Sequence, residues 1–132
     1  MIALDTSALV TILEQEPEAD LYAETMAAAD RLLIGMPTIL ELRLVMTARV
    51  GALTAEKAIA ALLADTVEQI AFGRPHLIAA TGALDRFGKG RHRAALNFGD
   101  CMAYAVAAVA GCPLLYKGDD FAQTDIMSAL TA

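Results

Sequence analysis

Short apolar runs alternate with longer segments of helical pattern along this chain of 132 residues, and this alternation constrains the fold most. Three of these runs are predicted strands, at residues 2–4, 31–35 and 114–116, and residues 66–70, which alternate between polar and apolar, are predicted to be a fourth strand. The segments between them are predicted helices, at residues 6–13, 17–28, 37–50, 54–65, 75–87 and 98–110. Strands that alternate with helices form parallel sheets covered on both faces. We therefore expect an α/β fold, a three-layer α/β/α sandwich with a central parallel sheet, in a single domain spanning residues 1–132.

Proline, glycine and capping residues mark the ends of the predicted helices. Pro37 fits the first turn of one helix, and Gly51 is expected to end it. Thr54 is expected to cap the next helix, and Asn97 the helix that begins at Phe98. The stretch from residue 88 to 97 is predicted to be a loop.

Composition excludes several classes of protein. A hydrophobic content of 57% is too high for intrinsic disorder. The longest apolar stretch, from Met102 to Tyr116, falls short of a membrane span of about 20 residues and is broken by Gly111. The first residues lack a basic region typical of a secretory signal. Two cysteines, Cys101 and Cys112, are too few for a disulfide framework. These features favour a cytoplasmic protein without a membrane anchor.

Acidic residues follow the predicted strands, and ligands of parallel sheets bind beyond the carboxyl ends of strands. Asp5 comes directly after the first strand, and Glu41 lies in the helix after the second. Asp100 lies in the first turn of its helix. Asp119, with Asp120 beside it, follows the last strand.

Each acid also has a purely structural interpretation. Asp5 is suited to cap the following helix, and Asp100 is suited to the positive end of its own. Asp119 fits a turn. Glu41 lies on the apolar side of its helix, so a structural role would require an arginine partner in the core.

The order of strands and helices predicts that Asp5 and Asp119 emerge at the same edge of the sheet. Topology rules do not decide whether Asp100 reaches that edge. If the carboxylates converge, two charges about 4 Å apart repel by about 4 kcal/mol at an effective dielectric of about 20. A divalent cation would relieve this repulsion, and an all-oxygen ligand set favours Mg²⁺ or Mn²⁺ over Zn²⁺.

Basic residues concentrate in one segment although the net charge of the chain is −6. Lys89, Arg91, His92 and Arg93 lie in the predicted loop, with Arg86 just before it. This segment is either a solvated loop or a contact for a phosphate backbone.

Four blocks of the sequence resemble a known family. They are IALDTSALVTIL at residues 2–13, PTILELRLVMTAR at 37–49, GKGRHRAALNFGDCMAYAVA at 88–107 and LLYKGDDFAQTDI at 114–126. In these blocks the chain resembles the PIN-domain ribonucleases of the VapC-like toxin type, which belong to bacterial type II toxin–antitoxin systems. The resemblance covers nearly the whole chain.

The resemblance implies an endoribonuclease dependent on Mg²⁺, or on Mn²⁺, with RNA as substrate, a cognate antitoxin as partner and a homodimeric assembly. The family's acidic quartet matches Asp5, Glu41, Asp100 and Asp119, with Asp120 as the alternative fourth acid. Asp5 and Asp100 are the expected metal ligands. The residues expected to bind substrate are Thr6, Ser7, Lys89, Arg91 and Arg93.

Two other classes of function are alternatives to this one. The first is a catalytically weak PIN-domain scaffold that acts as a binding partner in a regulatory complex. The second is a phosphotransfer domain, which would need a paired acidic cluster near the first strand. The segment DTSAL at residues 5–9 does not supply such a cluster.

Overall fold

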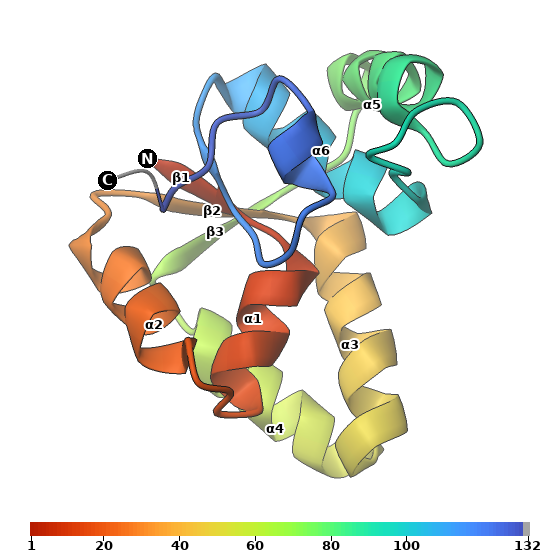
Figure 1. The fold of residues 1–132 in the computed structure, drawn as a ribbon. Helices are drawn as coiled ribbons and strands as arrows, with labels where there is room; N and C mark the ends of the chain where they lie inside the picture. The colour runs from red at the N-terminus through yellow and green to blue at the C-terminus, as the bar shows by residue number, and fades with distance from the viewer. Residues whose placement is uncertain (131–132) are drawn as a thin grey trace.

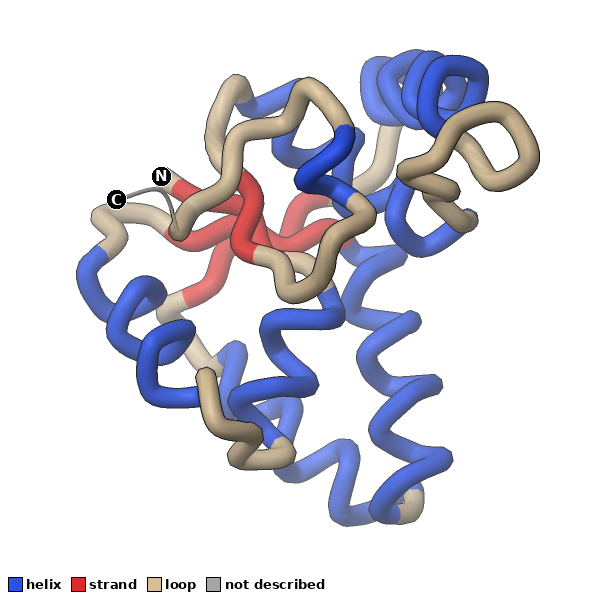
Figure 2. Tube along the Cα trace, in the orientation of Figure 1, coloured by secondary structure: helices blue, strands red, loops and turns tan. Residues whose placement is uncertain are grey.

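A computed structural model describes residues 1–130 and contains a four-stranded parallel sheet. The strands are β1 (Ile2–Leu4), β2 (Leu32–Gly35), β3 (Val67–Ile70) and β4 (Leu114–Leu115). Their order is β3-β2-β1-β4, and every pair of neighbours is parallel. Figure 2 shows these strands enclosed by helices above and below. The predicted three-layer α/β/α architecture is confirmed.

Helices cover both faces of the sheet (Figure 1). One face carries α1 (Thr6–Leu13), α2 (Ala19–Ala28), α3 (Met36–Val50) and α4 (Ala52–Leu63). On the other face α6 (Phe98–Ala110) covers the sheet and α5 (Arg74–Phe87) packs against α6. A short 3₁₀ helix, η1 (Phe121–Gln123), follows β4. No helix within residues 1–130 is both long and apolar enough to cross a membrane.

Strands β1, β2 and β4 divide their side chains between two hydrophobic cores because successive side chains point to opposite faces of a sheet. In β1, Ile2 and Leu4 pack in the core beneath α1 to α4, while Ala3 packs in the core beneath α6. In β4, Leu115 and Leu114 divide in the same way. Continuous apolar runs in the sequence therefore correspond to strands that are buried on both sides.

Most predicted ends of helices agree with the structure to within two residues, and Asn97 caps α6 as expected. The prediction for Thr54 is wrong, because α4 begins at Ala52 and Thr54 lies inside it. Gly51, at φ +86°, ends α3 and directly precedes α4, so one glycine makes the whole connection. The second helix begins at Ala19, two residues after the expected Pro17.

Candidate active site

The carboxyl ends of β1 and β4 lie side by side, because these strands are parallel neighbours. The Asp5 backbone N–H donates to the Leu115 carbonyl oxygen at 3.0 Å. The first turns of α1, α3 and α6 meet at this end of the sheet (Figure 1). A depression of about 350 Å³ here is lined by Asp5, Glu41 and Asp100. The convergence of Asp100, which topology rules left open, is therefore present in the structure.

Asp5 serves as a helix cap and still keeps one oxygen free. Its side chain is buried, and Oδ2 accepts hydrogen bonds from the Ser7 backbone N–H (3.0 Å) and the Ser7 hydroxyl (2.5 Å). The backbone N–H of Lys117 donates in turn to Ser7 Oγ at 2.9 Å, which ties the end of β4 to this cap. Oδ1 is buried and has no hydrogen-bond partner among the described residues. Helix capping thus explains the position of Oδ2 but leaves the buried Oδ1 without a structural role.

Asp100 takes part in the cap of α6. Asn97 Oδ1 accepts from the Asp100 backbone N–H at 2.9 Å, and Asp100 Oδ2 accepts from the Asn97 backbone N–H at 3.1 Å. This reciprocal arrangement is a capping box, and it fixes the rotamer of Asp100. Oδ1 makes no hydrogen bond within residues 1–130, so this acid also offers an oxygen to the depression.

Glu41 is half-buried on α3 and contacts both α1 and α6. The Thr6 hydroxyl donates to Glu41 Oε1 at 2.5 Å. Gly99 lies against the other side of the same carboxylate. An arginine partner, which the structural interpretation of Glu41 requires, is not found among residues 1–130.

The carboxylates affect one another's protonation. Burial raises the pKa of Asp5 from 3.8 to about 7, although the hydrogen bonds from Ser7 oppose this, and the charges of Asp100 and Glu41 raise it further. Burial also raises the pKa of Asp100 from 3.8 to about 6, with further contributions from the charges of Asp120 and Glu41. Mutual repulsion in a buried setting is a property of sites that bind a cation or handle protons.

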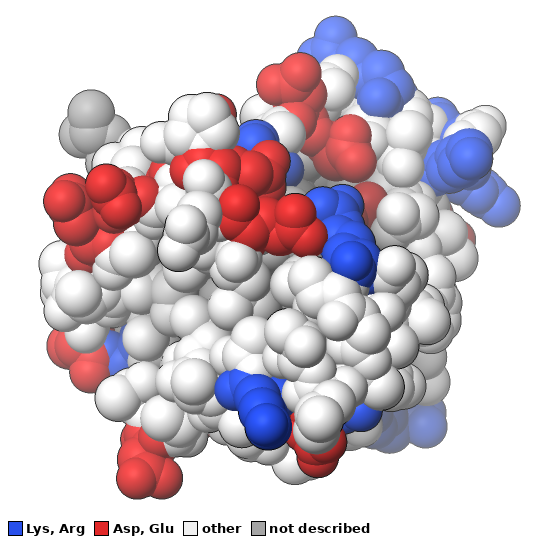
Figure 3. Space-filling model, turned by 90° about the horizontal axis from the view of Figure 1, so that it is seen from below, with Lys and Arg blue, Asp and Glu red and all other residues white. Residues whose placement is uncertain are grey.

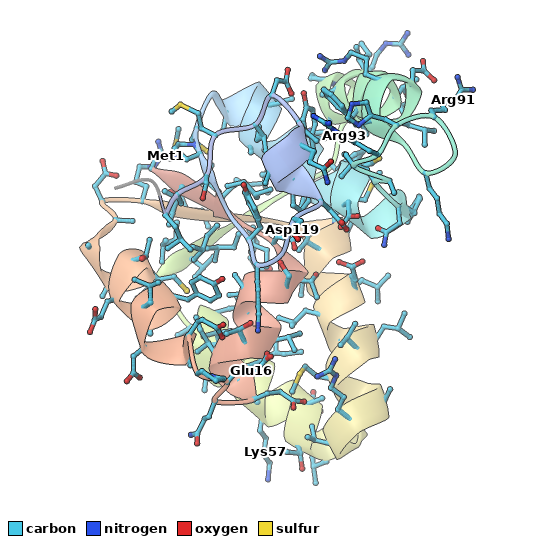
Figure 4. All side chains as sticks on the ribbon, in the orientation of Figure 1. Met1, Glu16, Lys57, Arg91, Arg93 and Asp119 are labelled. Atoms are coloured by element: carbon cyan, nitrogen blue, oxygen red, sulfur yellow. The ribbon has the colours of Figure 1, made fainter. Side chains whose placement is uncertain are left out.

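The two candidates for the fourth acid lie in the turn between β4 and η1, and both are exposed. Asp120 contributes its charge to the pKa shift of Asp100, whereas Asp119 is not among the causes of that shift. Figure 4 shows Asp119 above the first turn of α1. The electrostatics therefore favour Asp120 over the Asp119 of our prediction, and the fourth position stays a prediction between these two residues.

The residues of this site fit a hard divalent cation. Asp5 Oδ1 is a buried carboxylate oxygen without a partner, and Asp100 presents a second free oxygen to the same depression. Within residues 1–130, no three His, Cys, Asp or Glu side chains are grouped tightly enough to coordinate one ion directly. Mg²⁺ commonly binds through one or two carboxylates and keeps several waters, so two acids are a sufficient direct ligand set.

The hydroxyls predicted to bind substrate are engaged within the site. Thr6 donates to Glu41 and Ser7 donates to Asp5, so both orient the acids in this structure. In the sequence, only the position of Thr6 and Ser7 beside Asp5 indicates that they orient the acids. The sequence did not indicate a role for Lys117, which lies two residues after β4 and whose backbone N–H donates to Ser7 Oγ.

The basic loop lies apart from the acids. Lys89, Arg91 and Arg93 are exposed and form no ion pair within the part of the chain that the structure describes. Figure 4 shows Arg91 at the outer edge of the loop, and Figure 3 shows a group of basic side chains at one corner, with acidic side chains beside it and further basic side chains elsewhere on this face. Arg86 differs from the loop residues, because it pairs with Asp125 at 3.2 Å.

Comparison with known proteins agrees with this architecture. The PIN domain family model matches residues 2–127. The chain is 40% identical over 125 residues to Ribonuclease VapC30 of Mycobacterium tuberculosis, covering 95% of each chain. It is 44% identical over 126 residues to Ribonuclease VapC36 of the same organism, covering 93% of this chain and 89% of that protein. The chain therefore belongs to the PIN-domain family, as a VapC-like member.

Solved structures share the fold at low sequence identity. Mycobacterium tuberculosis VapC20, described as a Sarcin-Ricin loop cleaving toxin, aligns with a TM-score of 0.78 at 17% identity, covering 96% of this chain and 97% of that one. The VapBC2 structure from Rickettsia felis, bound to a DNA fragment from its promoter, aligns with a TM-score of 0.74 at 16% identity, covering 97% and 96%. These likenesses concern the fold.

Proposed function

We propose that this chain is a Mg²⁺-dependent endoribonuclease, with Mn²⁺ as an alternative ion, and the toxin component of a toxin–antitoxin system. The observation that carries the proposal is the buried Asp5 carboxylate, whose free oxygen lines the same depression as Asp100 and Glu41. The names of the relatives, which are VapC ribonucleases, support RNA as the substrate. A cytoplasmic location is consistent with such a substrate.

In this proposal the four acids have different roles. Asp5 and Asp100 would hold the ion through their free oxygens. Once bound, the ion would lower the pKa of a water molecule and stabilise negative charge on the scissile phosphate. Glu41, oriented by the Thr6 hydroxyl, would hold water around that ion or a second ion, and Asp119 or Asp120 would share this role.

The test is the loss of cleavage in Asp5→Asn. The substitution keeps a side-chain oxygen for the cap and removes the charge, so we expect RNA cleavage to fall by at least about 100-fold while α1 persists. Asp65→Asn is the matched control, because Asp65 is exposed in the turn between α4 and β3. EDTA should abolish cleavage by the native chain. Full activity of Asp5→Asn would refute the assignment, and no metal-dependent cleavage of any RNA would favour the scaffold alternative.

An antitoxin is the second proposed partner. The acidic depression suits an arginine side chain, whose guanidinium can bind a carboxylate through two hydrogen bonds. Solved neighbours include a toxin–antitoxin complex from Klebsiella pneumoniae, at a TM-score of 0.70. We expect a cognate antitoxin to block cleavage by the native chain, which an inhibition assay with the neighbouring gene product would measure.

A homodimer is the proposed assembly. An exposed apolar patch on α3 and α6 includes Leu40 and Leu44 (both 71% exposed) and Phe98 (80% exposed). Patches of this kind commonly mark interfaces between proteins. Leu40→Glu and Leu44→Glu should convert a dimer into a monomer, which light scattering after size-exclusion chromatography would detect.

A further inference from the structure

Gly99 lies in the first turn of α6 and faces α3. A Cβ atom at this position would lie 2.5 Å from Glu41 Cδ and even closer to Glu41 Oε2. Both separations are far below the distance at which nonbonded heavy atoms can approach. The Glu41 carboxylate therefore rests on the α6 backbone at a place where only hydrogen fits.

The opposite side of the same carboxylate is held by α1. The Thr6 hydroxyl donates to Glu41 Oε1 at 2.5 Å, and Thr6 is itself buried. Glu41 is thus enclosed between a hydroxyl of α1 and the backbone of α6. Glu41 also lines the depression, together with Asp5 and Asp100.

We infer that Gly99 is a positioning residue of the active site, which gives the Glu41 carboxylate the space to remain beside Thr6 and Asp100. This inference rests on the proposed function, in which Glu41 works together with the metal-binding acids. Gly99 touches no substrate and acts through Glu41 alone.

The close contact is specific to Glu41 and does not reflect close packing of the two helices in general. The three heavy atoms nearest to a Cβ at Gly99 all belong to the Glu41 carboxyl group. At Gly82, a glycine inside α5, a Cβ would meet nothing within 4 Å. A methyl group at position 82 would therefore meet no obstacle, whereas one at position 99 would meet the Glu41 carboxylate.

A methyl group at position 99 would displace a side chain and leave the backbone in place. The obstructed atoms are the far end of a flexible glutamate, which can rotate toward solvent. Gly99→Ala should therefore keep α6 intact, while Glu41 loses its hydrogen bond with Thr6.

The first measurement is Mn²⁺ binding to the metal-free full chain by isothermal titration calorimetry. We expect Gly99→Ala to bind Mn²⁺ about tenfold or more weakly, because groups that orient a metal site commonly contribute 10- to 100-fold to affinity. Gly82→Ala, the matched control, should bind as the native chain does. Native affinity in Gly99→Ala would overturn the inference.

The second measurement asks whether Gly99 acts through Glu41. The double variant E41A/G99A should bind Mn²⁺ with the same affinity as E41A, since the displaced carboxylate is already gone. A further loss in the double variant would overturn the inference. Native affinity in E41A would instead refute the role of Glu41 in the proposed function. If G99A alone fails to fold, E41A/G99A should fold, and its failure would also count against the inference.

The third measurement does not depend on metal. In EDTA, Thr6→Val should lower the thermal midpoint of the native chain, because it removes the donor to Glu41. The same substitution should have almost no effect in the Gly99→Ala background, where that hydrogen bond is already lost. Equal effects of Thr6→Val in both backgrounds would overturn the inference even if the native chain bound no Mn²⁺.

Discussion

Asp5 combines a capping role with an unfavourable burial, and the metal-free protein should therefore become less stable as pH rises. Its pKa is 3.8 in an exposed setting and about 7 in the folded chain. The folded state thus holds a proton that the unfolded state has already released. The protonated Asp5 carboxyl therefore stabilises the folded state fully below about pH 4, and this stabilisation is lost as pH rises to about 7. It amounts to about 4 kcal/mol in the free energy of unfolding.

Asp5→Asn isolates this effect from the other acids. In EDTA, urea unfolding at pH about 5 and about 8 should show a smaller fall in stability for the variant than for the native chain. At pH about 8, Asp5→Asn should be more stable than the native chain. The expectation fails if both chains lose stability equally over this range.

The sequence indicated Asp5, Glu41 and Asp100 as candidates, because Asp5 follows a strand, Asp100 lies in the first turn of a helix and Glu41 lies on the apolar side of its helix. The structure brings these three acids to one depression. The sequence did not reveal that Gly99 bounds Glu41. That contact joins residues of α3 and α6 far apart in the chain, and no local pattern records which side chain faces a given glycine.

At the scale of elements, a small polar network fastens the segment after η1 to α5 and α6. The Tyr104 hydroxyl donates to Asp125 Oδ1 at 2.6 Å and accepts from Arg86 Nη2 at 2.9 Å. Tyr104 lies one turn after Asp100 on α6. The network therefore connects the segment that follows the fourth acid to the helix that carries the third.

Tyr104→Phe should lower the free energy of unfolding by about 1 kcal/mol, because it removes both hydrogen bonds and retains the ring. Tyr116→Phe is the matched control, since the Tyr116 hydroxyl makes no hydrogen bond within residues 1–130. Urea unfolding measures both variants. A similar loss in the two would show that the network contributes nothing specific.

The elements themselves were largely predictable, since proline and glycine punctuate the chain and strands buried on both faces read as apolar runs. The start of α4 was missed for a physical reason. Threonine is a good capping residue, but Gly51 had already turned the chain, so the helix began before Thr54. Local capping preference gave way to the geometry of the preceding turn.

At the scale of the whole molecule, the net charge of −6 conceals a separation of charge. Four acids and two basic residues line the depression, whereas Lys89, Arg91 and Arg93 lie on an exposed loop that leads directly into α6. Average charge alone would argue against a polyanionic substrate. The separation instead predicts that RNA binding depends on this loop and on a cation among the acids.

The salt dependence of RNA binding tests the role of this loop. With a non-hydrolysable single-stranded RNA and the chain in Mg²⁺, Arg91→Ala should weaken binding and reduce the slope of log affinity against log salt by about 0.7 for one lost phosphate contact. Lys57→Ala is the control, because Figure 4 places Lys57 on α4 at the opposite end of the molecule. Fluorescence anisotropy across salt concentrations gives both slopes. Equal slopes for the two variants would mean that the RNA phosphates do not contact the loop. The RNA would then have to bind along another surface of the protein.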